Sequence, residues 1–398
     1  MPNNINPDTP SIKPTKNWYY NPTVRSVIYQ ILAIIAVISF FAYIISNTLY
    51  NLESRGISTG FDFLNHPAGF GIIQSLIPYD ETYSYGTTFF VGLFNTLLVS
   101  GLGVVLATIL GFSIGVARLS NNWLVAKFAS VYIEIFRNIP LLLQILFWYF
   151  AVLRSLPGPR QSFEFFQSLY VNVRGVYLPK PILESGFGWV FAAIIVAVCA
   201  AIAVSRYNKK RQISTGINLP VGLINTAIII ILPVLAYYLA NSPVSWDIPA
   251  LKGFNFRGGI TITPEFLALL FALTMYTAAF IAEIVRSGIE SIDKGQTEAA
   301  QASGLSQKLI LKLVIIPQAL RVIIPPLTSQ YLNLIKNSSL ATAIGYPDLV
   351  SVFSGTTLNQ TGQAIEIIFM TMAVYLTISL AVSVLMNIYN RRIALIER

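Results

Sequence analysis

The sequence is poor in the residues on which most enzyme chemistry depends. Its 398 residues include one cysteine, Cys199, and one histidine, His66. So few thiols and imidazoles exclude a disulfide framework, a cysteine–histidine metal centre and most histidine-based catalysis. No Gly-x-x-x-x-Gly-Lys-Ser/Thr segment occurs, so the chain has no recognisable loop for the phosphates of ATP. We therefore expect no catalytic residue, no metal and no cofactor in this chain.

Charge is also scarce, and apolar residues take its place. Charged residues make up 11% of the chain and hydrophobic residues 55%. This composition, with a positive mean hydropathy, is typical of a protein that crosses a membrane several times. The net charge is +9, but nucleic-acid binding would need a basic face on a folded soluble domain, and we find none. We expect contact with membrane lipid and none with nucleic acid.

Long apolar stretches predict an all-α membrane protein with about eight transmembrane helices. The first lacks the short apolar core and cleavage site of a removable signal peptide, so we expect a retained span. Prolines in the external loops 154–187 and 241–262 exclude long helices there. The predicted spans are 27–49, 89–117, 188–205, 219–240, 265–285 and 364–388, with less regular ones near 128–153 and 319–345.

The basic residues predict the orientation of these spans. Most of the 26 Lys and Arg residues lie in alternate segments, as expected for the cytoplasmic side of a membrane. Both termini are then cytoplasmic. The run Arg206–Arg211 is interpreted as a short turn that anchors this topology. The basic segments are the N-terminal tail, 118–127, 206–218, 286–321 and the C-terminal tail.

One polar segment between two spans has the pattern of a helix–turn–helix. Ala299 and Ala300 favour a first helix, and Gly304 can adopt the left-handed conformation that ends it. Ser306 can cap a second helix, which Pro317 would close. In that second helix, one apolar side is expected to comprise Leu309, Leu313, Val314 and Pro317. Another protein could bind such a protrusion; the alternative is an ordinary cytoplasmic loop helix.

This segment resembles the EAA loop of bacterial ABC importer permeases. The match consists of Glu298, Ala299, Ala300, Gly304 and Pro317, whereas Val314 and Ile316 stand where Ile and Leu are usual. In that family the loop docks on the ATPase subunit. The resemblance therefore implies that these matching residues couple this chain to ABC ATPase subunits.

A second polar place lies at the start of the span 128–153. Glu134 and Arg137 are three residues apart and can pair on one helical face, and Pro140 should break the helix. Phe136, Arg137, Pro140, Leu141, Leu142 and Gln144 resemble the permease segment Phe-Arg-x-x-Pro-Leu-Leu-x-Gln. The resemblance implies a pathway or gating role for Arg137 and Gln144. The alternative for the two charges is an interfacial ion pair.

Further candidates for the translocation path are Lys336, Ser338, Ser339, Asn95 and Thr96. The first three belong to a segment similar to the Lys-x-Thr/Ser-Ser-Leu pattern of the polar-amino-acid branch of the family. Lys336 could instead extend to the membrane surface or pair with an acid. For Asn95 and Thr96 we favour a hydrogen bond between spans.

Several helix ends and loop residues have more local interpretations. Thr263-Pro264-Glu265 is typical of a helix N-terminus, with a capping residue, a first-position proline and an acid. We expect Glu283 and Arg286 to pair at the cytoplasmic end of that helix. Glu366 and the aromatics of residues 50–88 are expected at the membrane interface.

The resemblance covers residues 85–153 and 262–392, which we take as the two parts of a type I ABC importer permease core. The enlarged layout resembles the general L-amino-acid permeases. It implies an amino acid substrate, a second permease subunit, identical or homologous, and a periplasmic amino-acid-binding protein. A stand-alone secondary transporter or channel for small polar solutes is the alternative. The predicted segments are a disordered cytoplasmic tail (1–26), a first helix with its external loop (27–84), a two-helix insertion (154–261), the coupling loop (287–320, within the second core part) and a cytoplasmic tail (393–398).

Overall fold

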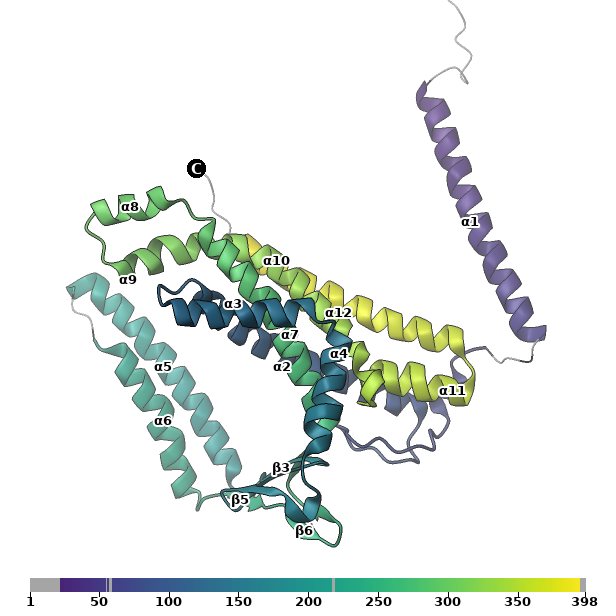
Figure 1. Ribbon diagram of the computed structural model, residues 1–398, viewed down its shortest axis with the longest axis horizontal. Coiled ribbons are helices and arrows are strands. Elements are labelled where there is room, and N and C mark those ends of the chain that lie inside the picture. The colour runs from purple at the N-terminus through teal and green to yellow at the C-terminus, as the bar shows by residue number, and fades with distance from the viewer. Residues whose placement is uncertain (1–21, 55, 57–58, 217–218, 394–398) are drawn as a thin grey trace, which may run out of the picture.

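Helices make up most of the part of the chain that the structure describes (Figure 1). The computed structural model describes residues 22–393 except 55, 57–58 and 217–218. The helices are α1 (Pro22–Ser54), α2 (Tyr85–Arg118), α3 (Trp123–Asn138), α4 (Leu141–Leu146), α5 (Phe187–Thr215), α6 (Val221–Leu239), α7 (Pro264–Glu290), α8 (Lys294–Ala302), α9 (Gln307–Ile310), α10 (Ile316–Asn337), α11 (Leu358–Thr361) and α12 (Ala364–Ile393).

The expected number of membrane spans is confirmed. In the described part of the chain, 7 helices are long and apolar enough to cross a membrane. The segments Trp123–Asn138 and Leu141–Ser155 add an eighth if they are counted together, although they meet at an angle of 105°. Pro140 stands at this break with an extended backbone, ψ 134°, which explains why the sequence pattern there is less regular.

The core of the molecule is the packing of α2 against α7. Small residues on α2 let the two backbones approach closely, as is usual for membrane helices. A Cβ added at Gly111 would lie 2.6 Å from the Cβ of Ile281, and one at Gly115 would lie 2.7 Å from the carbonyl oxygen of Ala282. α7 begins as predicted: Pro264 is its first residue, and Thr263 Oγ1 accepts a hydrogen bond from the Phe266 N–H at 3.3 Å.

The chain between α10 and α12 forms a second packed region. α10 passes into a 3₁₀ stretch (Ser338–Ile344), and a π-helical stretch (Val350–Thr357) leads to α11. Phe63 and Tyr85 pack here beside Phe353. These two aromatics, expected at the membrane interface, are buried by protein.

The two proline-containing loops pair with each other as short strands, which the sequence pattern did not indicate. β1 (Phe163–Phe165), β2 (Leu169–Asn172), β3 (Gly175–Leu178) and β8 (Ile260–Ile262) form an antiparallel sheet in that order. Val176 is opposite Ile262, so the sheet joins segments on either side of α5 and α6. β4 (Lys180–Leu183) pairs with β5 (Val244–Asp247), and β6 (Ala250–Lys252) with β7 (Asn255–Arg257).

α5 and α6 form a hairpin that packs principally on itself, and α1 stands apart from the other helices (Figure 1). The run Arg206–Arg211 lies within α5, so the predicted turn there is wrong. Lys, Arg and Gln are good helix formers, and the helix continues until Gly216, whose φ is +70°.

The predicted terminal tails lie mostly outside the described residues. This is true of 1–21 and 394–398. Residues 22–26, expected in the N-terminal tail, belong instead to α1, and Ile393 belongs to α12.

Candidate functional site

The loop that contains Glu298 is a short helix ended by a left-handed glycine. α8 begins after Asp293, whose Oδ1 accepts a hydrogen bond from the Gly295 N–H at 2.8 Å. At its other end Gly304 has φ +76°. The Gly304 N–H donates to the Gln301 carbonyl at 2.9 Å, and the Leu305 N–H donates to the Ala300 carbonyl at 3.2 Å. This Schellman geometry confirms the predicted role of Gly304 in the turn.

Glu298 and Ala299 lie on the outer face of α8 and are exposed, whereas Ala300 is buried. α8 contacts α9 and the π-helical turn after it (Leu311–Ile315). Ala300 therefore helps to hold the two helices of the loop together. The carboxylate of Glu298 remains on the surface, where a partner could reach it.

The second helix of the loop differs from the prediction in where it ends. Pro317 does not close it; the helical segment runs from Gln307 to Ile344, and Pro317 lies in the first turn of α10. The π turn directly before Pro317 changes the hydrogen-bond pattern of the helix, which continues through this proline as it does through Pro325 and Pro326. Ser306 precedes α9 with an extended backbone as expected, but its side chain makes no capping hydrogen bond.

The predicted apolar side of this second helix does not pack inward. Leu309 and Leu313 are exposed, whereas Ile310 is fully buried. The π turn at Leu311–Ile315 shifts the phase of the residues after it relative to a regular α-helix. The loop therefore presents leucine side chains outward.

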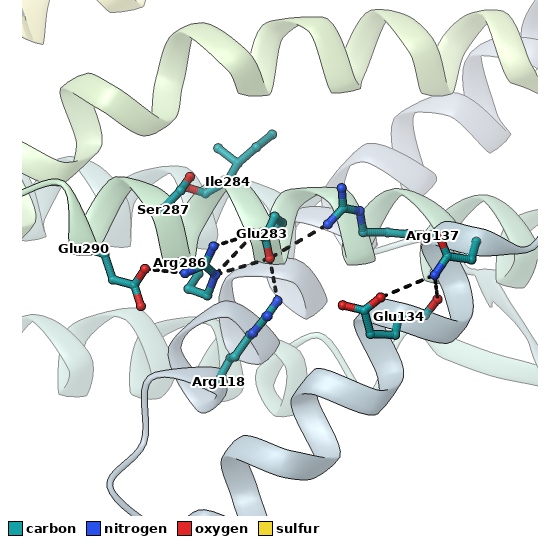
Figure 2. A network of polar contacts seen from close by, with 9 residues as sticks. Arg118, Glu134, Arg137, Glu283, Ile284, Arg286, Ser287 and Glu290 are labelled. Carbon is teal, nitrogen blue, oxygen red and sulfur yellow. Dashed lines mark hydrogen bonds and ion pairs between the residues drawn. The ribbon is translucent and has the colours of Figure 1, made fainter.

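A charged cluster lies where α2, α3 and α7 meet (Figure 2). Glu283 on α7 accepts from Arg118 Nη1 at 2.5 Å and from Arg286 Nη2 at 2.6 Å. Arg137 Nη1 is 3.9 Å from the same carboxylate, and Arg286 also pairs with Glu290. The expected Glu283–Arg286 pair is thus confirmed, and the sequence pattern gave no sign that Arg118 would join it.

Arg137 does not form the predicted pair with Glu134. Its guanidinium lies near Glu283 and 5.3 Å from the centre of the Phe280 ring. Glu134 accepts instead from Asn138 Nδ2 at 3.3 Å. The three-residue spacing would have allowed Arg137 to pair with Glu134. The packing of α3 on α7 brings the carboxylate of Glu283 near Arg137 instead.

Gln144 stabilises the helix break at Pro140. Its side chain is buried, and Nε2 donates to the carbonyls of Phe136 at 3.0 Å and Ile139 at 2.9 Å. A proline break leaves carbonyl groups without helical partners, and such groups are costly inside a membrane. The observed contacts thus give Gln144 a stabilising task at the bend.

Asn95 and Thr96 form hydrogen bonds between elements. Asn95 Nδ2 donates to the carbonyls of Gln74 at 2.8 Å and Pro347 at 2.9 Å. Thr96 Oγ1 accepts from the Leu349 N–H at 3.0 Å. Both side chains are fully buried, as expected for residues that form hydrogen bonds between elements rather than line a path.

The remaining predicted path residues follow one another at the end of α10. Lys336 is exposed and forms no ion pair within the described part of the chain. Ser338 is buried, and its hydroxyl donates to the Ile335 carbonyl at 2.7 Å. The Ser339 hydroxyl donates to the Lys336 carbonyl at 2.7 Å.

Two buried acids have roles that sequence reasoning missed. Asp348 is fully buried and accepts from the Ser351 N–H at 2.9 Å, as a capping residue does. An acid directly before an apolar run could have indicated this cap. Glu366, expected at the membrane interface, is buried by protein and accepts from the Gly60 N–H at 2.7 Å. Within the described residues no group of three or more His, Cys, Asp and Glu side chains could hold a metal ion.

Comparison with known proteins identifies relatives over nearly the full chain. Residues 213–395 match the family described as "Binding-protein-dependent transport system inner membrane component". The chain is 57% identical over 380 residues to the putative amino-acid ABC transporter permease protein YhdX of Escherichia coli K12, covering 96% of this chain and 97% of the relative. It is 49% identical over 379 residues to the general L-amino acid transport system permease protein AapQ of Rhizobium johnstonii, covering 95% and 94% of the two chains.

A third relative is the glutamate/glutamine/aspartate/asparagine transport system permease protein BztB of Rhodobacter capsulatus. It is 43% identical over 410 residues, with 95% of this chain and 96% of the relative covered. Among solved structures, an amino acid ABC transporter crystallised with histidines aligns with a TM-score of 0.45 at 22% identity, covering 77% of this chain and 95% of that one.

Proposed function

From the premise that this chain belongs to the family of amino-acid ABC transporter permeases, we propose how it works within the importer. The chain is the multi-pass membrane subunit of an ATP-driven amino acid importer. It forms the translocation path and opens to each side of the membrane in turn. Hydrolysis of ATP takes place on separate ATPase subunits, and the α8–α9 loop transmits the resulting motion. The observation that carries this proposal is the exposed Glu298 face of α8, held outward by the turn at Gly304.

The surface of the loop suits a protein partner. Glu298 offers an exposed carboxylate, and Leu309, Leu311 and Leu313 are between 43% and 58% exposed. Apolar side chains beside a charge are typical of the centre and rim of a protein interface. We infer that the ATPase docks on Glu298, Ala299 and the segment that continues to Pro317, while the buried Ala300 and the turn at Gly304 hold this surface in place.

The connections of the loop explain how docking could move the membrane helices. One end of the loop follows α7 within a few residues, and the other continues without a break through the π turn into α10. The Glu283 cluster ties α7 to α2 and α3. A displacement of the loop is therefore passed to α7 and α10, and through Glu283 to the helices packed on α7.

The arrangement of the chain supports cytoplasmic termini. The Pro22 end of α1, the end of α12, the tip of the α5–α6 hairpin and the α8–α9 loop lie toward one side, and the strands toward the other (Figure 1). The basic residues concentrate on the side of the loop, as expected for the cytoplasm. We infer that a periplasmic amino-acid-binding protein delivers its cargo at the opposite side.

A second permease subunit, identical or homologous, would complete the path. For the residues that line it we retain Arg137, Gln144, Lys336, Ser338, Ser339, Asn95 and Thr96 as candidates. Lys336 is the strongest, because an exposed ammonium can attract the carboxylate of an amino acid. The names of AapQ and BztB, general L-amino acids and the acidic amino acids with their amides, support an amino acid as the cargo.

The coupling proposal is tested with Gly304→Val in the assembled importer. Valine is strained at the left-handed φ of +76°, although a Cβ there would meet no atom within 4 Å. We expect ATP-dependent amino acid uptake in vesicles to fall at least about tenfold, since a strain of roughly 1–3 kcal/mol distorts the turn. The membrane content of the chain should stay unchanged.

Two variants serve as controls for this measurement. Gly304→Asn should retain uptake, because asparagine tolerates the left-handed region. Gly216→Val creates the same strain at the end of α5, where φ is +70° and no atom lies within 4 Å, and should leave uptake unchanged. Equal loss in the Gly216 and Gly304 variants would contradict the coupling role, and uptake without any ATPase would favour a stand-alone transporter.

A further inference from the structure

The α5–α6 hairpin is distinguished by charges of a single sign. α5 carries Arg206, Lys209, Lys210 and Arg211 near its end, and neither α5 nor α6 contains an Asp or Glu. None of these cations has an ion-pair partner among the residues that the structure describes. A positive-inside topology needs basic residues at this end of the hairpin, but it does not require them to line a groove.

Two of the four cations do line one. A groove of about 390 Å³ lies between α5 and α6, and its polar end contains Ser205, Arg206, Lys209 and Asn225. Asn225 Nδ2 donates to the Ser205 hydroxyl at 2.8 Å across the two helices. This hydrogen bond fixes the helix spacing beside the two cations, so the polar end is a built feature of the hairpin.

The other end of the same groove is apolar and open to the membrane. Val198, Ile202 and Ile229 line it, and their side chains are 44%, 48% and 47% exposed. α6 has no buried residue at all. The groove thus has cations at one end and aliphatic side chains along the rest of its length.

The depth of the groove in the bilayer matches the two parts of a lipid. α6 has 19 residues and begins at Val221, about the length that crosses the hydrocarbon core. Asn225, and with it Arg206 and Lys209, therefore lies near the level of the lipid headgroups. Ile202 and Ile229 lie deeper, at the level of the acyl chains.

We propose that this groove is a binding site for an anionic glycerophospholipid. Its phosphate contacts Arg206 and Lys209, and one acyl chain lies along Val198, Ile202 and Ile229. A guanidinium can donate two parallel hydrogen bonds to a phosphate, and an ammonium adds a compact positive charge. Basic pockets between membrane helices are suited to anionic headgroups for this reason. The site is independent of the transport function proposed above.

The experiment measures lipid binding to the full-length chain in detergent, by native mass spectrometry during titration with dioleoylphosphatidylglycerol. The test variant is R206Q/K209Q. Its matched control is K210Q/R211Q, which removes the same charge from the same helix but leaves the groove intact. Each variant keeps two cations to support membrane insertion, which the amount of chain in the membrane fraction checks.

The first lipid should bind roughly thirtyfold more weakly to R206Q/K209Q, as expected for two cations that contact an anionic headgroup. The affinity of the control variant for the first lipid should fall by less than about threefold. Ile202→Trp fills the apolar end without changing any charge, and it should also weaken binding. Dioleoylphosphatidylcholine should bind to all forms more weakly than the anionic lipid binds to the unaltered chain.

Three results would overturn the site. Equal losses of lipid affinity in the two charge variants would show that the four cations attract anionic lipid only in a general way. Arg206 and Lys209 would then form no specific site. Unchanged binding in the Ile202 variant would show that no acyl chain occupies the groove. Competition by free glycerol phosphate at the same concentration as the lipid would identify a soluble phosphate as the occupant.

Discussion

The α2–α7 core and the α5–α6 hairpin are both helix pairs, but they differ in which side chains face the neighbouring helix and which face outward. In the core, glycines and other small residues face the neighbouring helix, and side chains such as Ile281 are fully buried. In the hairpin, large aliphatic side chains point outward, and α6 buries none of its residues. The core is therefore specified by close contacts between helices, whereas the side chains of α6 have few such contacts within the described part of the chain.

This difference shows where each region can tolerate change. A core helix gains its stability from close van der Waals contact, because lipid offers apolar side chains no hydrophobic advantage for association. The contact energy lost by a substitution that separates α2 from α7 is therefore not replaced by other interactions. The exposed side chains of the hairpin have few close contacts of this kind to lose.

The largest effect is expected from Gly111→Ala. The added Cβ would lie 2.6 Å from the Cβ of Ile281 and 2.9 Å from the Ala278 carbonyl oxygen. We expect a loss of about 3 kcal/mol in unfolding free energy, because backbone must move to make room. Thermal unfolding in detergent measures it.

The controls for this substitution lie on the same helix and in the hairpin. Gly101 on α2 and Gly222 on α6 have no atom within 4 Å of an added Cβ. Gly101→Ala and Gly222→Ala should leave stability unchanged or raise it by about 0.5–1 kcal/mol. A loss at either position as large as that at Gly111 would remove the contrast between core and hairpin.

A smaller effect is expected from Glu283→Gln. The change leaves Arg118 and Arg137 without their carboxylate partner, while Arg286 retains Glu290. Since Glu283 is 25% exposed, we expect a loss of roughly 2 kcal/mol, between the values for surface and buried pairs. Chemical denaturation in detergent is the readout. The control Glu290→Gln, at a side chain 51% exposed, should cost less than about 1 kcal/mol.

The smallest effect is expected from Gln144→Leu, which removes the two hydrogen bonds across the break at Pro140. Because Leu has a similar size, the cost should be about 1–2 kcal/mol from the carbonyls left without partners. Thermal unfolding and uptake are measured together. A loss of uptake with unchanged stability would place Gln144 in the translocation path and separate that role from its task at the bend.

Much of the site could be predicted from sequence because its signals are local. The turn at Gly304 depends on the conformational freedom of one residue, and the start of α7 on the order Thr263-Pro264-Glu265. The end of the second loop helix was mispredicted at Pro317. The helix instead passes through the π turn and Pro317, and α10 also continues through Pro325 and Pro326, because neighbouring helices and local backbone adjustments allow proline within membrane helices.

The sequence by itself determined the number of membrane spans, the break at Pro140 and the left-handed turn of the loop. Each of these follows from hydropathy or backbone preference within a short stretch of chain. Tertiary structure alone decided that Arg118 binds Glu283, 165 positions away, and that Asn95 and Gln144 bind backbone carbonyls. Such partners are chosen by the packing of distant helices, because a polar group forms a hydrogen bond only where the fold brings a matching group within reach.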